Sequence, residues 1–179
     1  MRRGELFVKK KVIIAVIVLV AIGGLIYARS RAIDYYSLQT AIAEAKGDFP
    51  RAINSFDKVV LLSPRDAAAF VYRARLYFNN GNTNAAIDDL NTAINIDKKN
   101  PEAHFGISLI RLQEGDLKQA VKELDLVIKE RPKWIEAYLS REVAYRKLGD
   151  KDKAIKDLKQ VLKLEPQNPA ALNSLRALE

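Results

Sequence analysis

A glycine recurs in this chain every 34 residues. The four glycines, each followed directly by Asp or Asn, are Gly47, Gly81, Gly115 and Gly149. Five residues after each glycine stands an alanine, which gives the series Ala52, Ala86, Ala120 and Ala154. Phe or Leu follows four residues after each of these alanines. A fixed period of this length indicates one small unit used repeatedly, with neighbouring units burying one another's apolar faces.

Each column of the repeat has a physical explanation. Gly followed by Asp or Asn ends one helix in a left-handed turn and caps the next helix. The alanine allows two helices to approach closely, and the apolar residues four and seven positions later lie on the same helical face. Proline ends the second helix at Pro64, Pro132 and Pro166. Asn100-Pro101 and Asn168-Pro169 then have the N-cap and first-turn chemistry of a new helix.

This helix-turn-helix unit resembles the tetratricopeptide repeat family. The resemblance covers four repeats, at 33–66, 67–100, 101–134 and 135–168. It implies an all-α fold, a right-handed α-solenoid of paired helices behind the N-terminal segment. Residues 169–179 restart the first-helix pattern, and we expect a capping helix in which Leu172, Leu175 and Leu178 cover the last repeat.

Two columns of the family's first helix can be assigned by this resemblance. Its bulky residue corresponds to Tyr36, Phe70, His104 and Tyr138. Its small residue, four positions later, corresponds to Thr40, Ala74, Ser108 and Glu142. Because Thr40 and Glu142 are larger than the family prefers, we expect looser packing in the first and fourth repeats.

Residues 12–28 carry no charge and are mostly β-branched or leucine. As a helix they would be about 25 Å long, which is enough to cross a bilayer when flanking Lys and Arg side chains reach the interfaces. The sequence thus predicts a transmembrane helix at 12–28 behind a basic segment at 1–11. No Pro or Gly separates Arg29 from Ile33, so we expect this helix to run almost directly into the first repeat.

Basic residues flank the apolar segment unequally. Five precede it and two, Arg29 and Arg31, follow it closely. The positive-inside rule then predicts a single-pass protein with a cytoplasmic N-terminus and the repeats on the far side, with a bacterial inner membrane facing the periplasm favoured. The alternative is a signal peptide cleaved after residue 23 and a soluble secreted domain, since Ala21-Ile22-Gly23 is a small-x-small site. The apolar run continues to Ala28, which favours the anchor.

Catalytic chemistry is not indicated. The chain has no cysteine, and its one histidine, His104, lies in the packing column. No phosphate-binding glycine motif or metal-ligand spacing occurs, so we predict no enzyme activity, cofactor or metal. We interpret Trp134 as an interhelix contact, Arg73 and Arg141 as structural, and Asp88-Asp89 as a solvated face. The net charge of +8 comes mainly from residues 1–32, which argues against a nucleic-acid groove on the repeats.

The resemblance implies that a protein or peptide partner binds the inner face lined by the first helices. This stripe has an apolar centre and a mixed charged rim, which is typical of protein-binding surfaces. Ser37, Ala41, Val71 and Arg75 stand where the family's chaperone-tail clamp has Lys and Asn, so that activity is not implied. The predicted binding residues are Val71, Tyr72, Arg75, Phe78, Asn79, Phe105, Leu109, Leu112, Leu139, Val143 and Arg146.

The sequence therefore favours a membrane-anchored scaffold or adaptor, used in the assembly of an envelope protein complex, with the bilayer contacted through residues 12–28. The alternative is an ancillary chaperone that holds newly translocated chains near a translocation channel. A third reading is an import receptor, which requires the opposite topology. The sequence leaves the partner and the oligomeric state open.

Overall fold

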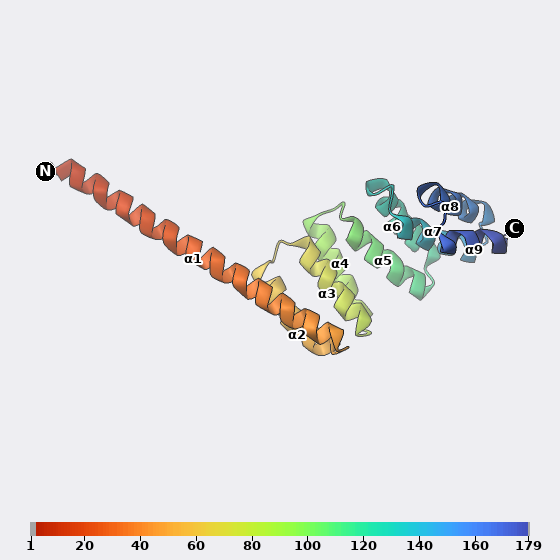
Figure 1. Cartoon of the computed structure of the whole chain (residues 1–179), viewed down its shortest axis with the longest axis horizontal. Helices are drawn as coiled ribbons and strands as arrows, with labels where there is room; N and C mark the ends of the chain where they lie inside the picture. Colours follow the sequence, from red (N-terminus) through yellow and green to blue (C-terminus); the bar gives the residue numbers. More distant parts are fainter. Residues whose placement is uncertain (1–2, 179) are drawn as a thin grey trace. The chain divides into compact units, whose positions relative to one another are not determined.

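The structure is a computed structural model that describes the backbone of residues 3–178. All regular structure in these residues is α-helical (Figure 1). The helices are α1 (Arg3–Ala45), α2 (Phe49–Leu62), α3 (Ala67–Asn79), α4 (Thr83–Ile96), α5 (Pro101–Glu114), α6 (Leu117–Glu130), α7 (Ile135–Lys147), α8 (Lys151–Leu164) and α9 (Pro169–Leu178). The chain divides into two compact units, of which the first ends at Pro64 and the second begins at Arg65.

The first unit is built on one long helix. Helix α1 continues without a break from the apolar segment into the first repeat, as expected. Its part from Ile13 to Ala45 is long and apolar enough to span a membrane by length and composition. Helix α2 packs on the C-terminal part of α1, and Arg29 Nε donates a hydrogen bond of 2.7 Å to the carbonyl of Leu62. The end of α2 therefore lies level with Arg29.

The second unit contains three helix pairs, α3 with α4, α5 with α6 and α7 with α8. The first helix of each later pair also packs on the second helix of the pair before it, so that α5 contacts α4 and α7 contacts α6. One cluster of buried side chains joins α3, α4 and α5 through Ala74, Leu90 and Ile107. This stacking agrees with the right-handed solenoid that the sequence predicts.

The turns between paired helices follow the predicted chemistry. Gly47, Gly81, Gly115 and Gly149 all have φ between 71° and 81°. A side chain at that φ is strained, so glycine is required there. The next residue caps the following helix in each case: Asp48, for example, accepts a hydrogen bond from the backbone N–H of Arg51. The same cap is made by Asn82, Asp116 and Asp150.

The alanine column is buried in every helix pair. Its four members, Ala52, Ala86, Ala120 and Ala154, have no exposed surface. The apolar residue four positions later is buried in every repeat as well: Phe56, Leu90, Leu124 and Leu158. These two columns form the centre of each repeat, as predicted.

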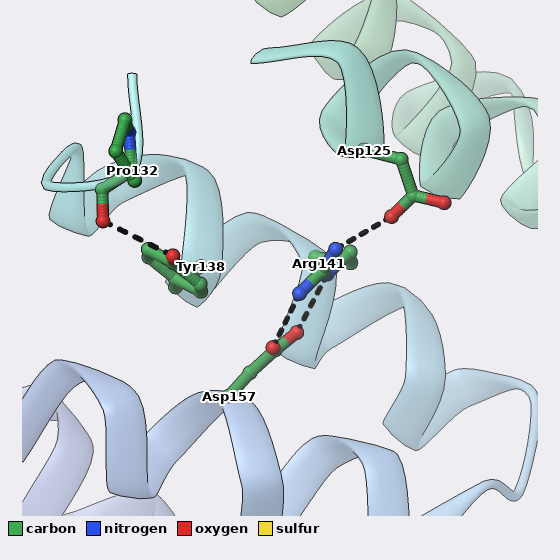
Figure 2. Close-up of polar contacts among 5 residues, drawn as sticks. All are labelled: Asp125, Pro132, Tyr138, Arg141 and Asp157. Atoms are coloured by element: carbon green, nitrogen blue, oxygen red, sulfur yellow. Dashed lines mark hydrogen bonds and ion pairs between the residues drawn. The ribbon is translucent and has the colours of Figure 1, made fainter. Parts of the chain in front are cut away.

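Ion pairs support the packing in the second unit. Arg73 of α3 forms two hydrogen bonds, of 2.7 and 2.8 Å, to the carboxylate of Asp89 on α4. Arg141 of α7 binds Asp157 on α8 in the same way and also contacts Asp125 on α6 (Figure 2). Burial lowers the pKa of Arg141, but the hydrogen bonds and charges of Asp157 and Asp125 outweigh this and leave the pKa raised. The two arginines are structural, as the sequence indicated.

The interpretation of Asp88-Asp89 as a solvated face is half wrong. Asp88 is exposed, but Asp89 is buried because it is the partner of Arg73. In the third repeat the same two columns hold Ile107 and Glu123. Glu123 instead lies 2.6 Å from Nδ1 of His104, whose Nε2 is 3.2 Å from the carbonyl of Lys98. His104 is thus a core histidine with partners, as expected.

The expectation of looser packing at Thr40 and Glu142 is wrong, because both side chains are buried. The Thr40 hydroxyl donates to the carbonyl of Tyr36 at 2.8 Å, so its polar atom is satisfied within α1. Glu142 accepts a hydrogen bond of 3.2 Å from Arg146 Nε. Burial raises the pKa of Glu142, and the charge and hydrogen bond of Arg146 oppose this only in part.

Helix α9 packs on the last repeat. Leu175 and Leu178 pack against the cluster of Tyr138, Leu158 and Val161. Leu172 is only half-buried, and the fully buried residue of α9 is Ala171. The side chain of Asn168 caps the helix by accepting a hydrogen bond from the N–H of Ala171.

We predict that Ala120→Trp destabilises the protein by about 1–3 kcal/mol, because the larger side chain must separate the helices that meet there. Urea unfolding of residues 33–179, followed by circular dichroism, measures this. The control is Lys118→Trp, which places the same side chain at an exposed position of α6. Equal stability of the two variants would contradict the close contact at Ala120.

We also predict that Glu142→Gln stabilises the protein at neutral pH. Because the folded-state pKa of Glu142 is raised, the folded protein favours the protonated form. The stability that this protonated form contributes is present below the ordinary glutamate pKa of 4.5 and is lost as the pH rises through the raised value. The gain from Glu142→Gln should therefore be largest at pH 7 and shrink towards pH 4. Urea midpoints at both pH values test this, with the exposed Glu136→Gln as control.

Candidate functional site

A cleft of about 270 Å³ lies on the second unit, between the first helices α3 and α5. Its floor is formed by Ala86 and Leu90 of α4, which contacts both first helices. Trp134, just before α7, belongs to the lining as well. The complete lining is Val71, Ala74, Arg75, Phe78, Ala86, Leu90, Glu102, Phe105, Gly106, Leu109, Ile110 and Trp134.

Helical spacing explains how α3 lines this cleft. Val71, Arg75 and Phe78 are separated by four and three residues and so lie on one face of the helix. On α5, Phe105 and Leu109 have the same spacing. Between them Gly106 has no side chain, and a Cβ atom there would lie 2.8 Å from Cδ2 of Leu90. Glycine at this position therefore lets α5 approach Leu90 and keeps the space between the helices open.

Aromatic contacts hold one wall of the cleft. The rings of Phe105 and Trp134 lie with centroids 4.7 Å apart and planes tilted by 33°. Both side chains are half-buried. The prediction that Trp134 is an interhelix contact agrees with its packing on Phe105. Sequence reasoning did not place Trp134 in the binding surface, because it stands in a turn rather than on the first-helix stripe.

Charged groups line the rim. Arg75 is exposed, and its guanidinium lies 4.5 Å from the ring centroid of Tyr72. Glu102 forms an ion pair with Arg131, whose guanidinium lies 5.3 Å from the ring centroid of Trp134. The cleft is thus apolar inside and carries charges of both signs at its edge, so it suits an apolar group with polar neighbours rather than a free ion.

The structure brings five of the eleven predicted binding residues together in the cleft. They are Val71, Arg75, Phe78, Phe105 and Leu109. Tyr72 lies beside them under Arg75. The other five do not line the cleft: Leu139 packs against the C-terminal cluster and Arg146 binds Glu142, while Asn79 is exposed and Leu112 and Val143 are half-buried.

No group of three or more His, Cys, Asp or Glu side chains suited to a metal ion occurs in the described part of the chain. The cleft lining includes one acidic residue, Glu102, and Arg131 already neutralises it. The arrangement can therefore bind an apolar group, and nothing in its lining supplies a nucleophile with an adjacent base.

Two family models match parts of the chain. The model described as TPR repeat matches residues 74–111, which include most of the cleft, and the model described as tetratricopeptide repeat matches residues 143–168. The comparison with curated protein sequences gives no match.

Solved structures show a similar fold. A crystal structure of MamA protein is 22% identical, with 83% of this chain and 81% of that chain covered and a TM-score of 0.72. Pseudomonas aeruginosa PilF is 15% identical, with 84% and 69% covered and a TM-score of 0.74.

A third structure contains a bound peptide. It is the first TPR of Spaghetti (RPAP3) bound to an HSP90 peptide, which is 27% identical, with 63% of this chain and 89% of that chain covered and a TM-score of 0.60. The repeat period, the helix pairs and these matches agree on one fold, which serves as a scaffold for protein–protein interaction. The chain therefore contains tetratricopeptide repeats, matched directly at residues 74–111 and 143–168.

Proposed function

We propose that this protein is a single-pass membrane-anchored scaffold that holds a protein partner in the cleft between α3 and α5. The observation that carries the proposal is the cleft itself, an apolar hollow lined by Val71, Phe78, Phe105, Leu109 and Trp134. Contiguous patches of apolar side chains at a protein surface usually mark binding sites.

The partner should insert a bulky apolar side chain. About 270 Å³ is enough space for such a side chain, and the mainly apolar lining would leave a buried polar group unpaired. Arg75 at the rim would favour an acidic residue beside the inserted one, since an arginine next to aromatic rings is a frequent hot spot in interfaces. The partner's polar main chain would remain at the charged rim.

The membrane anchor is supported by α1. In its segment 12–28, every residue whose side chain the structure describes is exposed to its surroundings, and an exposed apolar helix of this length is stable in a bilayer, where its backbone is hydrogen-bonded internally. Tyr27, close to Arg29, stands where an aromatic residue at the membrane interface is expected. The excess of basic residues before the segment supports an N-terminus in the cytoplasm and repeats on the other side of the membrane, which we propose is the periplasmic side of a bacterial inner membrane.

A role in assembling an envelope complex follows from these two features, because the anchor keeps the bound partner at the membrane surface. The alternative role, an ancillary chaperone for newly translocated chains, uses the same cleft. The two differ in what is captured: a scaffold holds one stoichiometric partner, whereas a chaperone crosslinks to many unfolded chains.

For the anchor, we predict that the protein stays in the membrane fraction after an alkaline carbonate wash. Protease added to spheroplasts should remove the repeats, since they lie outside the cytoplasm. A tag at the N-terminus should stay protected until the membrane is permeabilised. Release of a soluble protein with a new N-terminus near Gly24 would establish the cleaved signal peptide instead.

For the cleft, we predict that Leu109→Asp abolishes partner capture from native membranes and leaves the helix content unchanged. The side chain of Leu109 is 38% exposed, so an aspartate there puts a charge into the cleft with little cost to folding. The matched control is Leu126→Asp on α6, where the leucine is 43% exposed and lies outside the cleft. The pair Arg75→Ala and Phe105→Ala should weaken binding by about 2 kcal/mol or more, roughly thirtyfold.

Trp134 provides a second measurement, because it is the single tryptophan of the chain and lines the cleft. Addition of the purified captured protein should shift its fluorescence emission in the wild type and not in Leu109→Asp. Normal capture by Leu109→Asp, with loss of capture by Asp88→Lys and Asn95→Lys on the exposed face of α4, would move the site to the outer face and reject the cleft.

A further inference from the structure

An exposed apolar stripe runs along the part of α1 that lies beyond the membrane segment. Tyr35 and Leu38 are each 58% exposed and Ile42 is 42% exposed. The three residues are separated by three and four positions and therefore lie on one face of the helix. This face is opposite Thr40, the buried residue whose hydroxyl is 3.5 Å from the carbonyl of Ala52 on α2. Helix α2 therefore does not cover the stripe.

The repeat itself shows that part of this stripe normally has a partner. Tyr35 and Ile42 correspond, by the 34-residue period, to Ala103 and Ile110 in the third repeat. Those two residues are buried, in a cluster with the second helix of the preceding pair. In the first repeat, the residues that come before Tyr35 in the chain form the earlier part of α1 itself. They therefore cannot pack on this face as a separate preceding helix. The positions that a neighbouring helix covers in the third repeat are therefore exposed in the first repeat, where they hold the large side chains of Tyr35 and Ile42.

The stripe continues into the membrane segment with a regular spacing. Alternate steps of three and four residues connect it to positions 14, 17, 21, 24, 28 and 31, and all of these are exposed. Within the segment the series includes the small residues Ala21, Gly24 and Ala28, which let two transmembrane helices approach closely. The seam, defined as Ile14, Ile17, Ala21, Gly24, Ala28, Arg31, Tyr35, Leu38, Ile42 and Ala45, has the heptad spacing of a two-helix coiled coil.

We propose that the seam of α1 packs against the seam of a second copy of this chain, as a parallel two-helix coiled coil that crosses the membrane and extends to the first repeat. The inference rests on the proposed membrane anchor. It assigns to α1 a second interaction surface, separate from the cleft between α3 and α5.

A second copy fits the seam better than another occupant, because it is inserted in the same orientation and presents the same residues at the same depth. The seam is about 46 Å long by the helical rise, and only about 21 Å of it lies beyond Arg31. A soluble partner could contact only that shorter part, less than half of the seam, whereas a second copy in the same membrane can contact its whole length.

The charges of the seam also suit a parallel dimer. Arg31 is its one charged residue, and Asp34 lies 4.0 Å from it on the same helix. Two copies therefore bring two arginines and two aspartates to one level, where the charges balance. In the heptad, Ile42 occupies core position a and Leu38 occupies core position d. A β-branched residue at position a with leucine at position d favours a coiled coil of two helices.

Disulfide trapping in native membranes tests the inference, and the natural chain contributes no background because it has no cysteine. Under mild oxidation, Leu38→Cys and Ala45→Cys should each give a product with the mass of two copies. Lys58→Cys, exposed on α2, is the control and should stay monomeric. In the variant Leu38→Asp with Ile42→Asp, the Ala45→Cys product should be lost while circular dichroism and membrane association are retained.

A carbonate wash of the same samples separates the two proposals. If Leu38→Cys stays monomeric in a protein that the wash leaves in the membrane, the coiled coil is rejected and the anchor stands. The same rejection follows from equal crosslinking at Lys58→Cys or from a product with the mass of a different protein. A protein that the wash releases rejects the anchor and the coiled coil together.

Discussion

The close contact of paired helices at the alanine column is the constraint on which the rest of this structure depends. With no exposed surface at Ala52, Ala86, Ala120 and Ala154, each pair has a fixed separation, and a larger side chain would change it. That separation sets where the next first helix can pack. The cleft between α3 and α5 follows from this arrangement, since Ala86 and Leu90 of the second helix between them form its floor.

Polar groups inside the stack add a second constraint. Arg73 with Asp89 and Arg141 with Asp157 join the two helices of a pair through two hydrogen bonds each. Buried charges of this kind are destabilising when one partner is lost. Glu142 differs from them, because its burial raises its pKa and Arg146 compensates only in part. The fourth repeat thus contains a carboxylate that favours protonation, at a position where the family prefers a small residue.

The two candidate interaction surfaces lie on different units and have different chemistry. The cleft is a hollow in the second unit with a charged rim, and its aromatic wall of Phe105 and Trp134 suits an inserted side chain. The seam of α1 is an exposed, mainly apolar stripe on the first unit that suits another helix. If both are used, the protein would hold its partner as a membrane-bound pair of copies, each with one cleft.

The sequence by itself determined the repeat period, the helix pairs, their caps and the alanine contacts, because these depend on local chemistry and on residues a fixed number of positions apart. It also identified Val71, Arg75, Phe78, Phe105 and Leu109 as surface candidates from one helical stripe. Only the tertiary structure decided that Asp89 is buried, that Glu142 fits the core and that Trp134 completes the cleft. Each of these depends on a neighbour that spacing does not specify: Arg73 across the helix pair, Arg146 one turn away, and Phe105 on the first helix of the repeat that Trp134 ends.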